Sequence, residues 1–260
     1  MNLVMDVGNT KIALGVYEEE EEEEELLSHW TIETNVGKTT DEYIALFHQL
    51  FQLRGLDASE VHDILISSVV PQLDQRLILV CQSYFNLTPM FVGPGIKTGL
   101  NILYDNPKEV GSDRIANAVA GIAYYGAPLI IIDFGTATTF CYITKNNQYA
   151  GGAIAPGMSI SMNALSQHAA KLPGIDTFKA PNVIAKNTVH AMQSGFLYGM
   201  VGQVEGMVSR IKEEMGADLK VIATGELAAL VKKETTAITI VDEWLTLKGL
   251  QLIYRKNRNT

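Results

Sequence analysis

The sequence predicts an α/β fold with two domains, each built around a β-sheet. Apolar strand-like runs alternate with amphipathic helical segments along most of the chain, which favours a partly parallel sheet covered by helices. At 260 residues and 47% apolar composition, the chain is long enough to bury two cores of ordinary size. Residues 3–17 and 129–143 share one pattern: an apolar strand, then Asp-x-Gly, then a second strand. This repetition predicts a duplicated β-hairpin.

The strands are predicted where short apolar runs end at turn residues. Residues 11–17 and 26–34 are expected to form an extended hairpin with the acidic run Glu18–Glu25 at its tip. That run also allows a cation-binding or interaction role, but like charges repel and favour a solvated loop. Further strands are expected at 63–70, 89–92, 128–144 and near 220.

The helices are predicted from caps and apolar periodicity. Thr39 and Glu42 have the spacing of a capping box, so a helix is expected over residues 40–54. Other helices are expected at 72–85, 111–125, 158–169, 187–215 and 240–257. The helix at 187–215 contains Gly195, Gly199, Gly202 and Gly206. Because each interior glycine costs about 1 kcal/mol relative to alanine, this face is expected to pack closely, either within the chain or in a dimer.

Composition excludes several classes of function. Eight of the 29 acidic residues form the run Glu18–Glu25, so the rest of the chain is nearly neutral despite a net charge of -9. The sequence has no basic patch with interleaved aromatic residues, so a nucleic-acid partner is not expected. Cys81 and Cys141 lack metal-ligand spacing, which fits a reducing cytosol. No apolar run approaches the roughly 20 residues of a membrane span. We therefore expect a soluble cytoplasmic protein without a membrane partner.

The two Asp-x-Gly hairpins have the chemistry of phosphate-binding loops. A glycine in the turn allows backbone N–H groups to approach phosphate oxygens. The hydroxyls of Thr10, Thr136 and Thr138 and the ammonium group of Lys11 add further donors. An aspartate at the strand end, Asp6 or Asp133, is suited to hold a hydrated magnesium ion or a monovalent cation. One such hairpin is weak evidence, whereas two in the same register are much stronger.

Five segments together resemble one protein family. They are DVGNT at 6–10, NPKEVGSDR at 106–114, DFGTATT at 133–139, GGAIAPGM at 151–158 and ATGE at 223–226. In this order they resemble type III pantothenate kinases, which belong to the acetate kinase, sugar kinase, Hsp70 and actin superfamily. The resemblance implies two actin-like (ribonuclease H-like) domains, each a mixed sheet with flanking helices, with ATP in the cleft between them. The expected domains are 1–115 and 116–260.

The resemblance also implies a reaction, the ATP-dependent phosphorylation of pantothenate in the first step of coenzyme A biosynthesis. Asp113 would be the general base that accepts the proton of the pantothenate primary hydroxyl. The substrate-binding residues would be Tyr104, Gly111, Ser112, Asp113, Arg114 and Thr188. From the residues alone, Ser112 and Asp113 also fit a helix cap, Tyr104 an ordinary strand aromatic residue, and Thr188 a helix cap.

Nucleotide and cation contacts follow from the same resemblance. The ATP-binding residues would be Asp6, Val7, Gly8, Asn9, Thr10, Lys11, Ile12, Ala13 and Thr136. Asp133 would bind K⁺ or NH₄⁺, and Asp6 would hold Mg²⁺ or a similar divalent ion through water. A homodimer with the long helix near its interface is expected. Glu226 departs from the family's Thr-Gly-Gly turn near the adenosine, where a carboxylate would crowd or repel the nucleotide.

Two other functions remain open at this point. One is a non-catalytic regulatory protein on the same fold, which would not need the three aspartates Asp6, Asp113 and Asp133. The other is a superfamily ATPase or phosphatase with another substrate, which would need a different substrate segment from residues 106–114.

Overall fold

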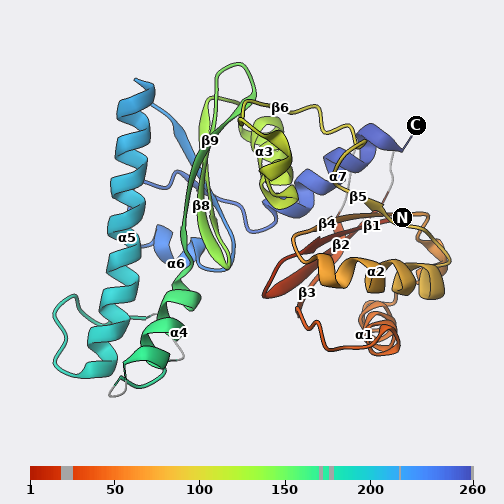
Figure 1. Ribbon diagram of the computed structural model, residues 1–260, viewed down its shortest axis with the longest axis horizontal. Coiled ribbons are helices and arrows are strands. Elements are labelled where there is room, and N and C mark those ends of the chain that lie inside the picture. Colours follow the sequence, from red (N-terminus) through yellow and green to blue (C-terminus); the bar gives the residue numbers. More distant parts are fainter. Residues whose placement is uncertain (19–25, 170–171, 176–178, 217, 259–260) are drawn as a thin grey trace. The chain divides into compact units, whose positions relative to one another are not determined.

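The chain forms two compact α/β units. The computed structural model describes residues 1–18, 26–169, 172–175, 179–216 and 218–258 (Figure 1). Unit 1 comprises Met1–Leu100, Asn106–Ala120 and Leu245–Thr260, and unit 2 comprises Asn101–Asp105 and Gly121–Trp244. The predicted fold class is confirmed. The chain nevertheless returns to unit 1 at its C-terminal end, so the units are not the two continuous ranges expected from the sequence.

Unit 1 contains a five-stranded mixed sheet with the order β3-β2-β1-β4-β5. The hairpin β1–β2 and its extension to β3 are antiparallel, whereas β4 pairs parallel to β1 and β5 parallel to β4. The strands are β1 Asn2–Val7, β2 Lys11–Tyr17, β3 Leu26–Glu33, β4 Asp63–Ser68 and β5 Met90–Phe91. The predicted pairing of 11–17 with 26–34 is confirmed, and residues 19–25 of the acidic run lie outside the described residues.

The two faces of this sheet differ because side chains alternate along each strand. Leu3, Met5 and Val7 pack in one core with residues of helices α1 (Thr40–Leu53) and α2 (Pro71–Val80). Asp6 has the opposite parity in β1, so its carboxylate lies on the other face. The predicted capping box is present: the Thr39 backbone N–H donates to Glu42 Oε2 at 2.7 Å, and Thr39 hydrogen bonds hold the pKa of Glu42 below its usual value.

The last helix, α7 (Leu245–Asn257), contacts β1, β2 and β4 of unit 1. The Tyr254 hydroxyl donates to the Asp63 carboxylate at 2.9 Å. The Asn257 side-chain amide accepts the Lys97 N–H and donates to the Lys97 carbonyl oxygen, each at 3.0 Å. The sequence predicted a helix from residue 240. That prediction was wrong at its start, because Ile240–Val241 form strand β11 in unit 2 and the helix begins only at Leu245.

Unit 2 repeats the arrangement around a six-stranded sheet with the order β11-β10-β7-β8-β9-β6. Its central strand β7 is antiparallel to β8 and parallel to β10, as β1 is to β2 and β4. The remaining strands are β6 Asn101–Ile102, β7 Leu129–Phe134, β8 Ala137–Ile143, β9 Gln148–Pro156 and β10 Lys220–Thr224. The predicted duplication of the hairpin is therefore present in the fold.

In the part of the chain that the structure describes, four helices accompany these strands. Helix α3 (Ser112–Tyr125) starts in unit 1 and ends in unit 2. Helices α4 (Met158–His168), α5 (Thr188–Met215) and α6 (Ala228–Lys232) belong to unit 2. Apolar residues of α5 and α6 form one core with β7, β8 and β10. Short helical turns occupy Ala58–Glu60, Cys81–Phe85 and Pro107–Glu109.

Packing among the described residues does not explain the interior glycines of α5. Gly195, Gly199 and Gly202 are exposed, and in the described part of the chain no atom outside the helix backbone lies within 4 Å of a Cβ built on them. A Cβ on Gly206 would meet only the guanidinium of Arg210, on the same helix, at 3.1 Å. Of the two explanations offered by the sequence, tight intrachain packing is wrong as far as the described residues show, and the dimer face stays a prediction.

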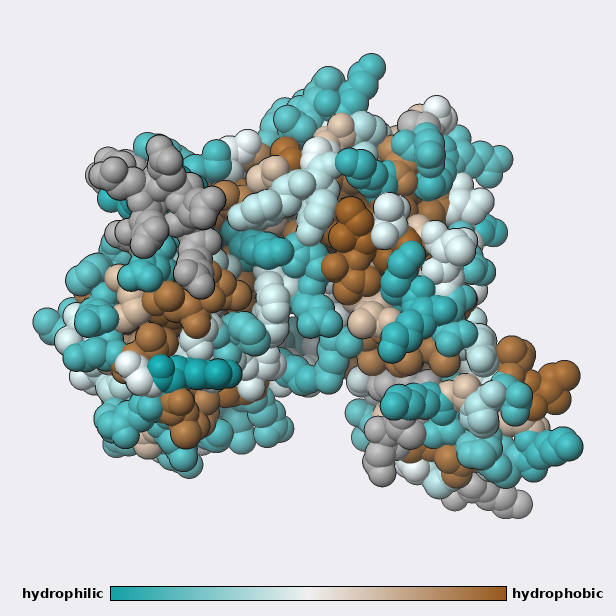
Figure 2. Space-filling view, turned by 180° about the vertical axis from the view of Figure 1, so that it is seen from behind, coloured by the Kyte–Doolittle hydropathy of each residue, from teal (hydrophilic) through white to brown (hydrophobic). Residues whose placement is uncertain are grey.

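Hydrophilic residues cover much of the face shown in Figure 2. Figure 2 shows one face of the molecule, where hydrophobic residues form separate patches among polar ones. Among the strongly exposed apolar side chains are Val183 and Ile184, which precede α5 and are 64% and 87% exposed. Among the described residues, no helix combines the length and apolar character that a membrane span requires.

Candidate functional site

The first Asp-x-Gly hairpin of unit 1 closes in a tight turn. The Gly8 N–H donates to the Lys11 carbonyl oxygen at 3.0 Å, and a Cβ on Gly8 would stand only 3.1 Å from that oxygen. Thr34, just after β3, holds the turn from the side: its hydroxyl donates to the Gly8 carbonyl at 2.6 Å and its N–H to the Thr10 carbonyl at 2.9 Å. Asn9 and Thr10 are consequently exposed at the tip.

The nucleotide-binding residues predicted here have different environments. Val7 and Ile12 are fully buried in the hydrophobic core, so their side chains are not available to a ligand. Asn9, Thr10 and Lys11 are exposed, and Asp6 and Ala13 are half-buried. Any contact of Val7 or Ile12 with a ligand must therefore come from the backbone.

Asp6 is connected to the start of α3 through a serine that the sequence did not identify. Ser67 of β4 lies opposite Asp6 in the parallel pair β1–β4. The Ser67 hydroxyl lies 2.9 Å from Asp6 Oδ1 and 2.9 Å from the Ser112 hydroxyl. Asp6 and Ser112 are thus brought together within unit 1, although they are far apart in the sequence.

The Asp113 carboxylate is fixed at the first turn of α3. Its Oδ1 accepts the Arg114 N–H at 2.8 Å and lies where a Cβ on Gly111 would stand. A side chain at position 111 would therefore displace the Asp113 carboxylate from this position. The guanidinium of Arg114 donates to the Glu109 carbonyl at 3.3 Å, which orients this side chain as well. Gly111, Asp113 and Arg114 form one cluster, all of it in unit 1.

The second hairpin, in unit 2, is surrounded by glycines. A Cβ on Gly157 would lie 2.5 Å from the Gly135 carbonyl oxygen, and the Gly157 N–H donates to the Thr136 carbonyl at 3.1 Å. In the turn after the neighbouring strand β10, a Cβ on Gly225 would lie 2.9 Å from Asp133 Oδ1. The loop after β7 thus meets both the start of α4 and the turn after β10.

Tyr104 and Thr188 also belong to unit 2. The nearest Tyr104 ring atom lies 3.5 Å from the Cβ position of Gly151, which has φ +131°. The ring centroids of Tyr104 and Tyr149 are 6.0 Å apart. Thr188 is the exposed first residue of α5. The alternative that Thr188 caps this helix is wrong, because Asn187 is the cap and accepts the His190 N–H at 2.8 Å.

The sequence reasoning missed several residues that support these loops, namely Thr34, Ser67 and Gly157. The structure shows that Ser67 has an equivalent beside the second hairpin. Asp6 and Asp133 are each the fifth residue of a six-residue strand. On the neighbouring parallel strand, the buried Ser67 lies opposite Asp6 and the buried Thr224 lies opposite Asp133. This equivalence depends on strand register, which a single sequence does not display.

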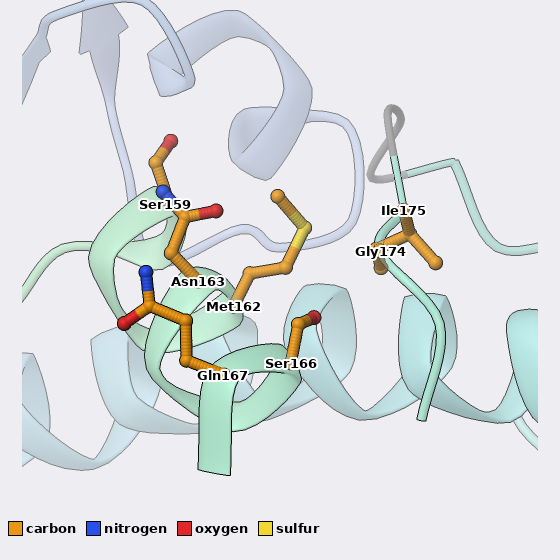
Figure 3. A pocket seen from close by; sticks show the side chains of 7 residues that line it. All are labelled: Ser159, Met162, Asn163, Ser166, Gln167, Gly174 and Ile175. Carbon is orange, nitrogen blue, oxygen red and sulfur yellow. The ribbon is translucent and has the colours of Figure 1, made fainter. Parts of the chain in front are cut away.

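The described residues line hollows on the surface. One, of about 250 Å³, is lined by Asn9 of the first turn together with Thr34, Val36, Val69, Val70, Pro71 and Gln72. The other, of about 430 Å³, lies along α4 in unit 2, where neutral polar side chains of the helix and Met162 face Gly174 and Ile175 (Figure 3). None of the predicted site residues lines this second hollow in the described part of the chain.

The described residues offer little for metal clusters or thiol chemistry. No group of three or more His, Cys, Asp or Glu side chains among them could hold a metal ion. Burial raises the pKa of the Cys81 thiol to about 12, so this thiol stays protonated and is a poor nucleophile. Oxygen atoms do converge near Gly225, where the Asp133 carboxylate and the Phe134 carbonyl both lie within 3 Å of the Cβ position. A hard cation prefers such oxygen ligands.

Comparison with solved structures supports the fold. A structure described as a conserved putative Baf family transcriptional activator from Campylobacter jejuni has 18% identity and a TM-score of 0.63, covering 99% of this chain and 100% of that one. A putative 2-dehydro-3-deoxygalactonokinase from Sinorhizobium meliloti has 11% identity and a TM-score of 0.62, with coverage of 99% and 97%. The activator of 2-hydroxyisocaproyl-CoA dehydratase from Clostridium difficile, solved with ADPNP, has 12% identity and a TM-score of 0.55, with coverage of 100% and 97%.

These similarities establish the actin-like ATPase fold, with two α/β units and mixed sheets. Residues 2–210 match the model of a family described as type III pantothenate kinase. The match includes both Asp-x-Gly hairpins and the Gly-Ser-Asp-Arg segment. The chain therefore belongs to the type III pantothenate kinase family.

Proposed function

We propose that the protein transfers the γ-phosphoryl group of ATP to the primary hydroxyl of pantothenate, giving 4'-phosphopantothenate. The observation that carries this proposal is the Asp113 carboxylate, which is held over Gly111 at the start of α3. A carboxylate in a fixed orientation is suited to accept the proton of an attacking hydroxyl. Family membership supports the choice of pantothenate as the substrate.

The residues around Asp113 would bind and orient the substrate. Arg114 would bind polar groups of pantothenate, and the backbone of Gly111 and Ser112 would approach it closely. Tyr104 and Thr188 would complete the substrate contacts. Phosphoryl transfer has a largely dissociative transition state, so these residues would act mainly by aligning the hydroxyl with the phosphorus atom.

Both Asp-x-Gly loops would take part in ATP binding. In unit 1, backbone N–H groups of residues 8–11 and the side chains of Asn9, Thr10 and Lys11 would bind phosphate oxygens, with Asp6 holding Mg²⁺ through water. In unit 2, Thr136 would contact ATP and Asp133 would hold K⁺ or NH₄⁺ near the Phe134 carbonyl. These cations, when bound, would neutralise charge on the phosphates.

We also propose a homodimer that uses the exposed glycine face of α5. Gly195, Gly199 and Gly202 are four and three residues apart, so they lie on one face of the helix. A helix with such a face is stabilised when a partner packs closely against it. A closed symmetric dimer is the commonest assembly that would supply this partner.

The experiment that tests the proposed reaction is a coupled ADP-release assay with pantothenate and a panel of its analogues, each with and without potassium. We expect ADP release that depends on pantothenate and is stimulated by K⁺. Release of ADP only with another acceptor would instead favour a different superfamily kinase or ATPase. Nucleotide binding without turnover on any acceptor would favour the regulatory alternative, which the description of the Campylobacter jejuni structure keeps open.

A further inference from the structure

We propose that Ser67 is a positioning residue for phosphoryl transfer, because its hydroxyl connects the Asp6 carboxylate to the first turn of α3, which carries Asp113. This inference rests on the proposed function. Ser67 has no exposed surface, and Ser112 is 9% exposed. Buried hydroxyl groups need hydrogen-bond partners inside the protein, so these contacts fix the positions of both side chains.

The direction of the hydrogen bonds follows from the groups present. An ionised carboxylate accepts only, so Ser67 donates its single hydroxyl proton to Asp6 Oδ1 at 2.9 Å. The Ser67 oxygen can then accept the proton of Ser112, whose oxygen lies 2.9 Å away. The Ser112 oxygen is also 3.3 Å from the Ser68 carbonyl, a longer contact that would remain without Ser67. The hydrogen bonds therefore lead from Ser112 in α3 through Ser67 in β4 to Asp6 in β1.

The connection matters because Ser112 and Asp113 are adjacent. Ser112 is the first residue of α3, and the hydrogen bond to Ser67 holds this end of the helix against the carboxyl end of β4. Loss of the Ser67 hydroxyl would remove one donor from Asp6 and would allow the start of α3 to shift. Displacements of about 1 Å can reduce an enzymatic rate about 10²-fold, so a small shift of Asp113 would be visible in turnover.

Unit 2 gives independent support. Thr224 of β10 is 2% exposed and lies opposite Asp133 in the parallel pair β7–β10, as Ser67 lies opposite Asp6 in β1–β4. A buried hydroxyl residue therefore accompanies the aspartate of both Asp-x-Gly hairpins. An ordinary core position in a parallel strand would be apolar. The repetition indicates that the hydroxyl serves the aspartate and is not a local accident of packing in unit 1.

The test is a double-mutant cycle between Ser67→Ala and Asp6→Ala, read by steady-state kinetics and by thermal unfolding. Ser67→Cys is a second variant that nearly preserves the side-chain volume but has a weak donor. The matched control is Ser28→Ala, because Ser28 in β3 is also a serine that is almost fully buried. Titration of Mg·ATP by calorimetry on every variant gives a readout that does not depend on pantothenate.

We expect Ser67→Ala to lower kcat about 10- to 100-fold, because a displacement of Asp113 of up to about 1 Å can cost about 10²-fold in rate. The KM for pantothenate should change less than about threefold, and Ser67→Cys should lie between wild type and Ser67→Ala. In the Asp6→Ala background, Ser67→Ala should lower kcat by a smaller factor than in wild type, since the acceptor Asp6 is already gone and only the contact with Ser112 remains to be lost. Ser28→Ala should behave like wild type.

Equal losses from Ser67→Ala in both backgrounds, or the same kinetics for Ser67→Ala and Ser28→Ala, would overturn the inference. Failure of the proposed function looks different. A wild-type protein that binds Mg·ATP but does not phosphorylate pantothenate refutes the proposed reaction, and the same cycle in Mg·ATP affinity then decides whether Ser67 and Asp6 are coupled. A wild-type protein that neither binds Mg·ATP nor turns over overturns both.

Discussion

The Asp133 carboxylate packs directly against the backbone of Gly225: a Cβ on Gly225 would stand 2.9 Å from Asp133 Oδ1 and 2.7 Å from the Phe134 carbonyl oxygen. Gly225 also has φ +89°, a conformation that residues with a side chain rarely adopt. The turn after β10 and the loop after β7 therefore form one structure, although they are separated by most of unit 2 in the sequence. A side chain at position 225 would displace the aspartate proposed to hold the monovalent cation.

Gly225→Ala should therefore abolish most activity, with ATP use reduced at least tenfold. Gly95→Ala is the matched control, because Gly95 has φ +96° but nothing within 4 Å of its Cβ position in the described residues. Both variants should lose about 1–2 kcal/mol of stability from backbone strain, and Gly225→Ala should lose more because its Cβ also meets the Phe134 carbonyl oxygen. Only Gly225→Ala should lose activity in steady-state assays. Equal activity of the two variants would contradict a role for the Gly225–Asp133 contact.

Asp113→Asn should lower kcat by roughly 10² to 10⁴, the range expected for loss of a general base. The asparagine oxygen can still accept the Arg114 N–H, so the thermal unfolding temperature should change little. ATP affinity, measured by calorimetry, should barely change. Asp41→Asn removes another first-turn carboxylate, in α1, and is the control for a general helix-dipole effect. A folded Asp113→Asn variant with near wild-type kcat would remove this residue from the mechanism.

Asp133→Asn should weaken both ATP use and the dependence of activity on K⁺. A neutral amide has lost the charge that makes a carboxylate a good ligand for a hard cation. The measurement is the initial rate as a function of potassium concentration at constant ionic strength, for wild type and variant. Wild-type rates that are the same in sodium and potassium buffers would count against a specific monovalent cation.

Replacement of Glu18–Glu25 by a short turn should leave activity and stability nearly unchanged. Tyr17 and Leu26 already pair at the ends of β2 and β3, so a short connection can join the strands. Loop closure entropy depends only weakly on loop length, and removal of eight like charges reduces repulsion. Kinetics and chemical denaturation test this expectation. A loss of activity in a variant of normal stability would show that the acidic run contributes to function.

Gly199→Leu distinguishes a dimer from a monomer. In a monomer, the substitution should stabilise α5 by about 1 kcal/mol, because leucine favours the helix and the position is exposed. In a dimer closed over this face, the leucine side chain should prevent close packing and release monomers. Light scattering at micromolar concentration, with Gly93→Leu in a loop of unit 1 as a control variant, separates these outcomes. Monomeric wild-type protein would refute the dimer.

Local physical chemistry allowed much of the fold to be predicted. The capping box at Thr39 and Glu42, the apolar runs of β1 and β7, and the Asp-x-Gly turns involve residues close together in the sequence, and all were found in the structure. The family resemblance rested on the same local segments. It identified Asp6, Asp113 and Asp133 as candidates, because each lies in a short motif whose residue types indicate its chemistry.

Other features were decided only by the tertiary structure. The return of Leu245–Thr260 to unit 1, the contact of Gly225 with Asp133, and the link from Asp6 through Ser67 to Ser112 join distant parts of the chain. The early start predicted for the last helix failed for the same reason, since Ile240–Val241 find their partner in β10. Periodicity, caps and turns act over a few residues. Strand register and close backbone packing depend on which surfaces meet, and only the folded chain determines that.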